Sequence, residues 1–340
     1  MNRSDRLGGP LTRTITPPGP LDVRRSMSTG YGARDPGTRR DHRGLWRATH
    51  TPDGPCTLLV RTPKTRPIEA GRLVVAPVEI WAWGPGAAYA LAQGEHWLGF
   101  HDDPSAFVPQ DAVLARAKRR HPGLRMGRGR DIFEVLLPTI LGQRVKSEEA
   151  SQSWRQLCYT VGAEPPGLKA GPRAIAAPCG LRLPARPERL KRISLPDYHR
   201  FGVEMARART LLEVCHHIGY VARAAEMPAE KAVPHLVRLP GIGPWTAMLT
   251  VAAVHGFADA IPVGDYHIPS VVAYALKGEP RANDARLLEL LEPYRGQRWR
   301  VIRLLGADRA SAPRFGPKRA TFGVHVALAT QRGRRNVAGG

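Results

Sequence analysis

The chain has 340 residues and a strongly basic composition: 51 Lys and Arg stand against 29 Asp and Glu, which gives a formal net charge of +22. This length allows one large or two small hydrophobic cores. The excess of positive charge means that the surface attracts polyanions. No apolar run approaches the roughly 20 residues needed to span a bilayer, and the N-terminus lacks the apolar core of a signal peptide. We therefore expect a cytoplasmic protein without a membrane partner, and nucleic acid is the leading partner that the charge predicts.

The four cysteines argue against a metal site. Cys56, Cys158, Cys179 and Cys215 are widely spaced and form no C-x-x-C pair. Neither a zinc site nor an iron–sulfur cluster is therefore predicted. Reduced thiols are the expected state in the cytoplasm.

Both ends of the chain are basic and lack hydrophobic periodicity. Residues 1–43 are rich in Arg, Gly, Pro, Ser and Thr, and residues 311–340 carry further arginines. Such segments bury too little apolar surface to offset the entropy lost on ordering, so we predict two disordered basic tails. The residues between them keep a basic excess of their own, so the positive charge is not confined to the tails.

Residues 44–111 predict a small antiparallel β-rich domain. Runs of β-forming residues are separated by turn signals, among them Pro52-Asp53-Gly54 and Gly84-Pro85-Gly86. Strands are expected at residues 45–50, 56–60, 72–76 and 78–83, followed by a short helix at 87–92.

From residue 112 to residue 310 the spacing of apolar residues predicts a helical domain. It opens with a basic run that comprises Arg116, Lys118, Arg119, Arg120, Arg125, Arg128 and Arg130. This run is either a solvated helix face or a linker that follows the phosphates of a nucleic acid. A further segment, residues 165–187, is rich in Pro, Gly, Ala and Arg and reads as an insertion to which the sequence assigns no role.

A turn interrupts the helical pattern between residues 131 and 159, where Pro138 also predicts a kink or a break. In Ile140-Leu141-Gly142-Gln143-Arg144 the glycine makes the turn and leaves Gln143 and Arg144 at its tip. These two are either ordinary turn residues or a wedge that fills the gap left when a nucleotide is extruded from a duplex.

The segment Leu239-Pro240-Gly241-Ile242-Gly243 lies between two predicted helices, of which the second covers residues 244–255. The two glycines allow a tight backbone that exposes bare amides. Free N–H donors and the dipole of the following helix both favour an anion, so this hairpin predicts a phosphate site.

One carboxylate follows the hairpin. Asp265 stands in Gly264-Asp265-Tyr266-His267-Ile268, just before another predicted helix. An aspartate at a helix start is commonly a cap that accepts hydrogen bonds from first-turn amides. The alternative is that Asp265 takes part in chemistry beside the phosphate site.

These motifs, in this order and spacing, resemble those of the helix-hairpin-helix superfamily of base-excision DNA glycosylases. The match over residues 112–305 is closest to the 3-methyladenine DNA glycosylase II type, and residues 44–111 are similar to the N-terminal antiparallel domain of that family. The resemblance implies an α+β fold with a mostly helical core. It also implies a monovalent cation on the hairpin carbonyls when DNA is bound, and no other cofactor.

The resemblance further implies roles for individual residues. Asp265 is the expected catalytic acid, because an ionised carboxylate stabilises the positive charge that builds on the sugar, or activates a water. Trp245 and Tyr266 are expected to line the base pocket. The residues expected to contact DNA are Gly241, Gly243, Gln143, Arg144 and Thr246.

Three positions depart from related enzymes of this superfamily. Strand-nicking members carry a lysine that forms a Schiff base with the sugar, and Trp245 stands in its place here. We therefore predict a monofunctional enzyme in which Trp245 either stacks on a cationic base or packs as a helix-core tryptophan. Arg144 replaces a commonly apolar wedge, and Leu249 stands where an aromatic residue can line the pocket.

The function that the sequence predicts is removal of a damaged, alkylated purine from double-stranded DNA by a monomeric, nucleoid-associated enzyme. Two alternatives stay open. One is a glycosylase for oxidised purines, against which the missing lysine weighs. The other is a non-catalytic protein that binds damaged DNA, against which Asp265 weighs and for which Leu249 weighs.

Overall fold

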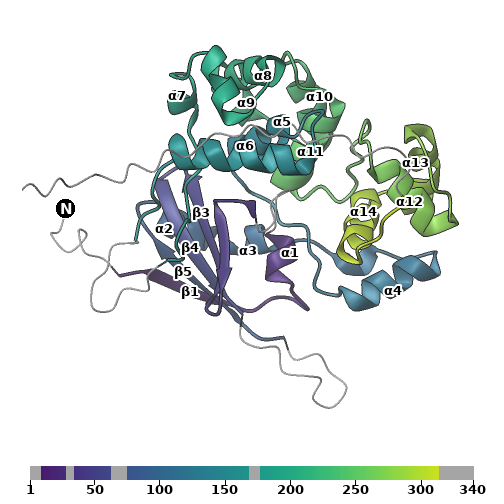
Figure 1. Ribbon diagram of the computed structural model, residues 1–340. Helices are drawn as coiled ribbons and strands as arrows, with labels where there is room; N and C mark the ends of the chain where they lie inside the picture. Colours follow the sequence, from purple (N-terminus) through teal and green to yellow (C-terminus); the bar gives the residue numbers. More distant parts are fainter. Residues whose placement is uncertain (1–8, 28–33, 63–74, 168–176, 314–340) are drawn as a thin grey trace, which may run out of the picture.

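The structure is a computed structural model that describes residues 9–27, 34–62, 75–167 and 177–313. It contains one five-stranded antiparallel sheet and a larger helical region that follows it in the chain (Figure 1). The α+β fold class is thus confirmed.

The sheet has the strand order β1-β5-β4-β3-β2. Its strands are β1 (Leu11–Ile15), β2 (Thr38–Asp41), β3 (Gly44–Thr51), β4 (Gly54–Arg61) and β5 (Val78–Trp83). The predicted strands 45–50, 56–60 and 78–83 are confirmed as β3, β4 and β5. Residues 72–74 of the remaining predicted strand lie outside the described residues, and residues 75 and 76 are not in a strand.

The prediction that residues 1–43 are disordered is wrong for the part of this segment that the structure describes. β1 pairs with β5, with Leu11 opposite Ala82, and β2 pairs with β3. Between them α1 (Val23–Ser26) is capped by Asp22, whose Oδ1 accepts a 2.9 Å hydrogen bond from the Arg25 amide. The sequence signal was weak because each of these elements is only four or five residues long. The two strands are stabilised by pairing with distant strands, which local periodicity does not reveal.

The two faces of the sheet are covered by different parts of the chain. One face packs on α1, α2 (Ala87–Ala92) and α3 (Gly94–Leu98), with Ile80 and Ala90 in that core. On the other face Trp46 and Trp83 stack and pack against Leu181 and Leu183. The insertion 165–187 therefore has a structural role in its described part: it covers an apolar sheet face.

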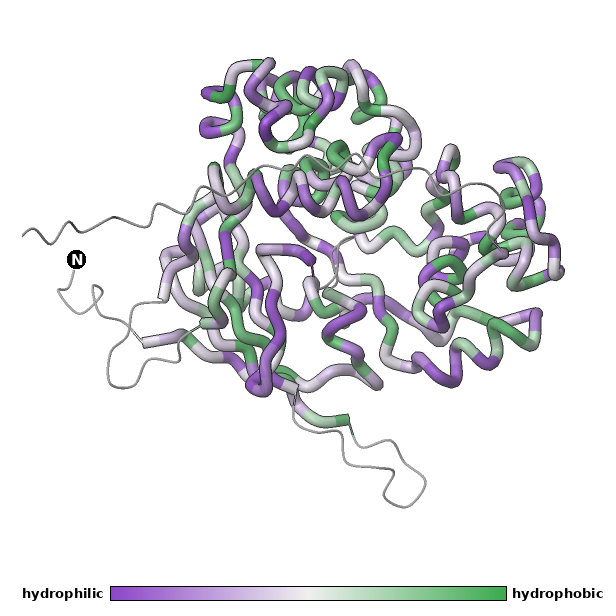
Figure 2. The backbone as a smooth tube through the Cα atoms, viewed as in Figure 1, coloured by the Kyte–Doolittle hydropathy of each residue, from purple (hydrophilic) through white to green (hydrophobic). Residues whose placement is uncertain are grey.

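The helices form two lobes, seen at the top and at the right of Figure 1. The upper lobe has one core built from α5 (Ile132–Leu141), α6 (Ser147–Thr160), α7 (Pro187–Leu190), α8 (Met205–His216), α9 (Ile218–Arg223), α10 (Ala229–Val237) and α11 (Pro244–His255). The second core joins α4 (Ala112–Arg120), α12 (Ile268–Lys277), α13 (Asp284–Leu291) and α14 (Arg298–Ala307). Hydrophobic and hydrophilic residues are mixed along many of these helices, as expected where one face packs on a core (Figure 2). α5 continues through Pro138 without a break.

A polar junction connects the sheet to the upper lobe. Glu134 of α5 is 7% exposed, and its carboxylate accepts hydrogen bonds from the Thr49 hydroxyl (2.7 Å) and the His50 amide (2.6 Å). Arg47 lies 3.7 Å from the same carboxylate. We call Arg47, Thr49, His50 and Glu134 the junction cluster. It positions α5, whose far end carries the turn described below.

The basic run of residues 112–130 mostly contacts protein groups. Arg125 is 5% exposed and donates to the carbonyls of Pro20 and Asp102. Arg120 pairs with Asp308, and Lys118 donates to the Phe107 carbonyl. These contacts favour a structural role for much of the run, and contact with phosphates stays a prediction for its exposed members.

Two further sequence-based expectations concern membranes and metals. None of the helices in the described ranges combines the length and the apolar composition needed to cross a bilayer. Within the same ranges no group of three or more His, Cys, Asp and Glu side chains is arranged to hold a metal ion, and the four cysteines are free thiols. Residues 314–340 of the predicted C-terminal tail lie outside the described residues.

Candidate active site

The hairpin between α10 and α11 has the geometry that its glycines predict. Gly241 has a φ of +82°, and a Cβ at this position would lie 1.9 Å from the Thr210 hydroxyl oxygen. Only glycine fits there, because both the backbone conformation and the neighbour exclude a side chain. Leu239 and Ile242 anchor the hairpin in the upper core, at 7% and 3% exposure.

The amides of Gly241 and Gly243 point to an anion site. Neither N–H has an acceptor among the described residues. Gly243 is the N-cap of α11, a helix of 12 residues, and no side chain caps it. Unsatisfied donors at the positive end of a helix dipole bind an anion without further change in the protein.

Asp265 is held by three N–H donors. Its Oδ1 accepts hydrogen bonds from the amides of His267 (2.8 Å) and Ile268 (2.9 Å), and its Oδ2 accepts one from the Trp245 indole (2.9 Å). The capping interpretation is therefore confirmed, and the indole adds a contact that a cap does not need. All three donors and the adjacent start of α12 stabilise negative charge on this half-buried carboxylate.

Trp245 connects Asp265 to the turn after α5. Its N–H binds Asp265, and its Cη2 lies 3.7 Å from where a Cβ of Gly142 would be. The side chain is half-buried rather than enclosed in the core. Trp245 is therefore not a fully buried helix-core tryptophan, and its stacking on a base stays a prediction.

Gln143 connects the same turn to the hairpin. Its amide nitrogen donates to the Gly241 carbonyl and to the Thr246 hydroxyl, both at 2.9 Å. Thr246 is 1% exposed, so its side chain is enclosed in this conformation, and its contact with DNA stays a prediction. It braces the hairpin from inside because it faces Gln143 rather than solvent.

The hairpin carbonyls retain some capacity for the implied monovalent cation. The Leu239 carbonyl accepts one hydrogen bond from the Ile242 amide, and the Gly241 carbonyl accepts the one from Gln143. A carbonyl oxygen has two lone pairs, so each retains one.

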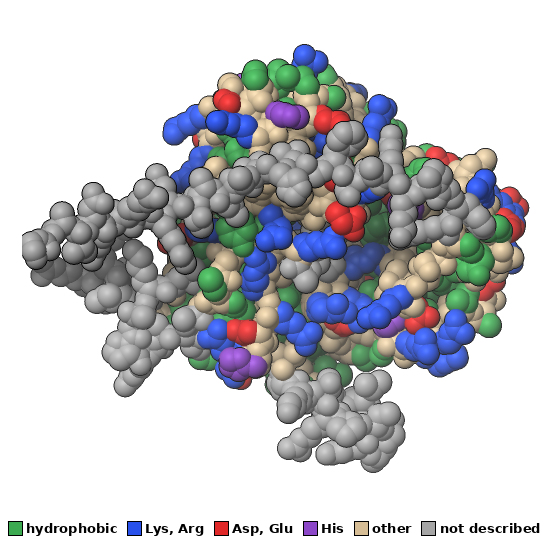
Figure 3. All heavy atoms as spheres, in the orientation of Figure 1, with side chains coloured by type: hydrophobic (Ala, Val, Ile, Leu, Met, Phe, Trp, Pro, Cys, Tyr) green, Lys and Arg blue, Asp and Glu red, His purple; other side chains and the backbone are tan. Residues whose placement is uncertain are grey.

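The remaining two predicted residues are on the surface. Arg144 is exposed and has a φ of +56°. Tyr266 is 88% exposed and contacts His267 edge-on, with ring centroids 4.9 Å apart. Tyr266 therefore does not line an enclosed pocket in this structure, and its contact with a base stays a prediction. On the face shown in Figure 3, Lys and Arg side chains are spread between the upper lobe and α14.

Two supporting residues were missed in the sequence. Arg207 of α8 is 5% exposed and donates a 2.8 Å hydrogen bond to the carbonyl of Leu141, at the end of α5. Thr210, one turn further along α8, fills the space beside Gly241. No motif marks them, because their roles depend on how α8 packs under the turn and the hairpin.

Comparison with solved structures identifies the class of fold. A 3-methyladenine DNA glycosylase from Archaeoglobus fulgidus superposes with a TM-score of 0.67 at 16% identity, covering 87% of this chain and 98% of that one. An 8-oxoguanine glycosylase/lyase from Clostridium acetobutylicum gives a TM-score of 0.61 at 12% identity, covering 88% and 98%. Neither a protein-family model nor a curated protein matches the sequence. The chain has the fold of the helix-hairpin-helix DNA glycosylases, as its motifs implied.

Proposed function

We propose that this protein is a monofunctional DNA glycosylase of base excision repair, which removes an alkylated purine from duplex DNA with Asp265 as the catalytic carboxylate. The observation that carries the proposal is the pairing of this carboxylate, held by three N–H donors, with a hairpin whose glycine amides are free. The fold shared with known glycosylases supports it.

The hairpin and the carboxylate have complementary tasks in this proposal. The Gly241 and Gly243 amides bind a backbone phosphate near the lesion, which fixes the position of the damaged strand. Asp265 then faces the sugar of the extruded nucleotide. As the bond between C1′ and the base nitrogen breaks, its electron pair leaves with the base, and the carboxylate stabilises the positive charge on the sugar until water adds.

An alkylated purine suits a site with a single carboxylate. Alkylation at a ring nitrogen makes the base cationic, so it departs as a neutral molecule without a general acid. The indole of Trp245 offers an electron-rich face for such a cation. Its N–H is not a nucleophile, so no Schiff base with the sugar is expected and the strand should stay intact.

An oxidised purine is the second candidate substrate, because one of the similar structures is described as an 8-oxoguanine glycosylase/lyase. The tryptophan at position 245 argues against a lyase of that kind. A third candidate, a protein that binds damaged DNA without chemistry, gains support only from the exposed position of Tyr266 and from Leu249.

The test is release of bases from alkylated, oxidised and deaminated duplexes by wild-type and Asp265→Asn protein, beside binding to abasic-site DNA. We expect wild type alone to release alkylated purines, no strand cleavage, and no covalent adduct after borohydride treatment. Binding by both proteins without release by either would establish the damage-binding alternative. Release of oxidised purines alone would establish the second candidate.

Duplex DNA is the proposed partner, and we propose that the protein binds it as a monomer. Contacts between arginines and phosphates release counterions, so log affinity should fall linearly as log salt concentration rises. The affinity for abasic DNA, measured at salt concentrations from about 50 to about 200 mM, tests this salt dependence. A flat salt response would contradict the electrostatic part of the proposal.

A further inference from the structure

Asp265 lies in a stretch of chain that buries little apolar surface. The stretch leads from α11 of the upper lobe to α12 of the second lobe, the one built from α4, α12, α13 and α14 (Figure 1). Asp265 itself is half-buried, and its neighbours along the chain are exposed: Val263, Gly264, Tyr266 and His267. Because packing contributes little here, hydrogen bonds must fix the position of the carboxylate.

One side chain from each lobe is bonded to this stretch. From the upper lobe, the Trp245 indole donates to Asp265 Oδ2 at 2.9 Å. From the second lobe, Asp284 Oδ2 accepts a 3.0 Å hydrogen bond from the Gly264 amide. Gly264 directly precedes Asp265, and its φ of +90° is a conformation that glycine adopts readily. The proposed catalytic carboxylate is thus held from both lobes.

The position of Asp284 is not explained by its own helix. It is the first residue of α13, where a carboxylate is favourable near the positive end of the helix dipole. The cap of this helix is Asn283, whose side chain accepts a 3.0 Å hydrogen bond from the Arg286 amide. Asp284 Oδ1 is buried and has no hydrogen-bond partner among the described residues. An unpaired buried oxygen lowers stability, so the dipole alone does not account for a carboxylate bonded to Gly264.

The helix that carries Asp284 is itself held in place. α13 packs against α12 and contributes Leu287, Leu290 and Leu291 to the core of the second lobe. Arg286 donates a 3.0 Å hydrogen bond from its Nε to the carboxylate of Glu279, in the connection between the two helices. Asp284 therefore presents its acceptor to the Gly264 amide from a fixed position.

We propose that Asp284 is a positioning residue for Asp265. By accepting the Gly264 hydrogen bond, it fixes the direction in which the Asp265 carboxylate faces the sugar, and it acts through the backbone rather than on the substrate. This inference rests on the proposed function, in which Asp265 is the catalytic residue. A displacement of about 1 Å can lower the rate of a catalysed step by roughly 100-fold, so the contact should affect base release more than DNA binding.

Release of a methylated purine in a single turnover, measured beside binding to abasic-site DNA, tests the inference. Asp284→Ala loses the acceptor for Gly264, so its rate should fall about tenfold or more, with binding within about twofold. Asp284→Asn keeps a side-chain oxygen that can accept the same hydrogen bond, so its rate should stay within about threefold of wild type. The matched control is Asn283→Ala, which removes the cap of the same helix and should lower the melting temperature without lowering the rate.

A second measurement does not depend on base release. The Trp245 indole N–H is bonded to Asp265, so its rate of hydrogen exchange reports whether the carboxylate stays in place. The indole signal can be assigned by NMR with Trp245→Phe. Its exchange should be faster by about fivefold or more in Asp284→Ala, and unchanged in Asp284→Asn and in Asn283→Ala.

Several results would overturn the inference. Release by Asp284→Ala at the rate of wild type would exclude it, and so would indole exchange that is the same in these two proteins. An equal loss of rate in Asn283→Ala would show that only the stability of α13 matters. A loss in Asp284→Asn as large as in Asp284→Ala would assign the effect to charge. If wild type releases no base from any duplex, the proposed function fails, and the exchange measurement still decides whether Asp284 holds Asp265 in place.

Discussion

Two carboxylates of this protein sit in opposite surroundings. Asp265 is half-buried and accepts a hydrogen bond from Trp245, in the first turn of the helix that follows the hairpin. Glu134 is 7% exposed at the junction of sheet and helices, where Arg47, Thr49 and the His50 amide contact it. Both accept backbone hydrogen bonds, yet only Asp265 is bonded to the helix whose N-terminus carries donors without acceptors.

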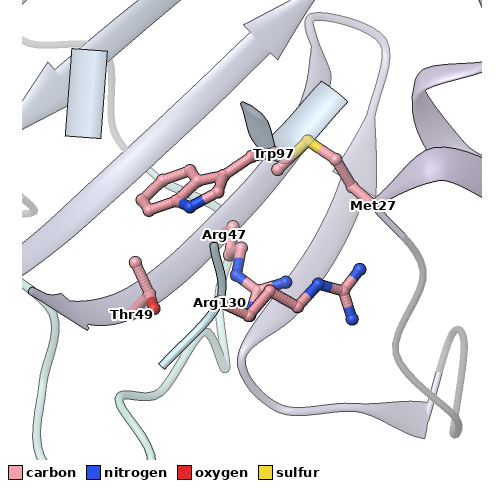
Figure 4. Close-up of a pocket in the computed structure, with 5 residues that line it drawn as sticks. All are labelled: Met27, Arg47, Thr49, Trp97 and Arg130. Carbon is pink, nitrogen blue, oxygen red and sulfur yellow. The ribbon is translucent and has the colours of Figure 1, made fainter. Parts of the chain in front are cut away.

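Burial has a clear chemical effect at the junction. It raises the pKa of Glu134 to about 7, with a smaller contribution from the negative charge of Asp131 and opposition from Arg47. Two small cavities adjoin this cluster, and Figure 4 shows Arg47, Thr49 and Arg130 around one of them. With volumes of about 10 and 20 Å³ they have room for about one water each.

The comparison shows that a shifted pKa and a cavity can mark an interface between structural units rather than a site of chemistry. In this protein the proposed site is marked instead by donors without acceptors, by an arginine with positive φ and by a carboxylate at a helix start. The following predictions test this division, beginning with the largest effect.

The two carboxylates should differ most in base release. Asp265→Asn removes the charge that stabilises the sugar cation, so single-turnover release should fall by roughly 10³-fold or more. Glu134→Gln should change release by less than about threefold, because Glu134 contacts β3 and none of the proposed site residues. A comparable loss in both variants, with both folded by circular dichroism, would contradict the division.

The two hairpin glycines should separate folding from binding. Gly241→Ala meets Thr210 and a φ of +82°, so it should lower the free energy of unfolding by about 2–4 kcal/mol. A Cβ at Gly243 meets nothing within 4 Å. Gly243→Ala should therefore change stability by less than about 1 kcal/mol, yet weaken binding to abasic DNA because its methyl group stands where a phosphate approaches. Urea unfolding measures the change in stability, and fluorescence anisotropy measures the change in DNA binding. Unchanged binding by Gly243→Ala would contradict a phosphate site at this amide.

Glu134 should make stability depend on pH. Its folded pKa of about 7 exceeds its ordinary value of 4.5, so between these values the folded state binds more protons than the unfolded state. Its contribution to stability is fully present below pH 4.5 and is lost as the pH rises through 7, with a slope of at most about 1.4 kcal/mol per pH unit. The difference in unfolding free energy between wild type and Glu134→Gln, measured from pH 5 to 8, should show this fall. A difference that is constant with pH would contradict it.

Two tryptophans offer the finest test, because each donates an indole hydrogen bond of 2.9 Å to an aspartate. Trp245 binds Asp265 at the site, and Trp154 binds the buried Asp35 near the junction. Trp245→Phe should lower the rate of base release about tenfold, with abasic-site binding within about twofold, since it loses one bond worth about 1.4 kcal/mol. Trp154→Phe should lower stability by a similar free energy without lowering the rate. The reverse pattern would show that Trp245 is only a packing residue.

Much of the site could be predicted from sequence because its parts are local. The helix predicted at residues 244–255 is confirmed as α11, and the conformation of Gly241 follows from the glycine pattern around it. Asp265 caps the residues two and three positions after it. Helix ends and tight turns depend on a few neighbouring residues, so their sequence signals are strong.

The contacts between these parts come from the tertiary structure. The Trp245 indole reaches Asp265 across 20 residues, and Gln143 reaches the hairpin across 98. Likewise β1 acquires its strand conformation by pairing with β5, and Thr246 is buried because Gln143 covers it. The sequence alone determined the superfamily motifs, the glycine hairpin and the helix cap at Asp265. Packing of distant segments decided which of these residues support the site and which face a ligand, because burial and hydrogen-bond partners are properties of the folded chain as a whole.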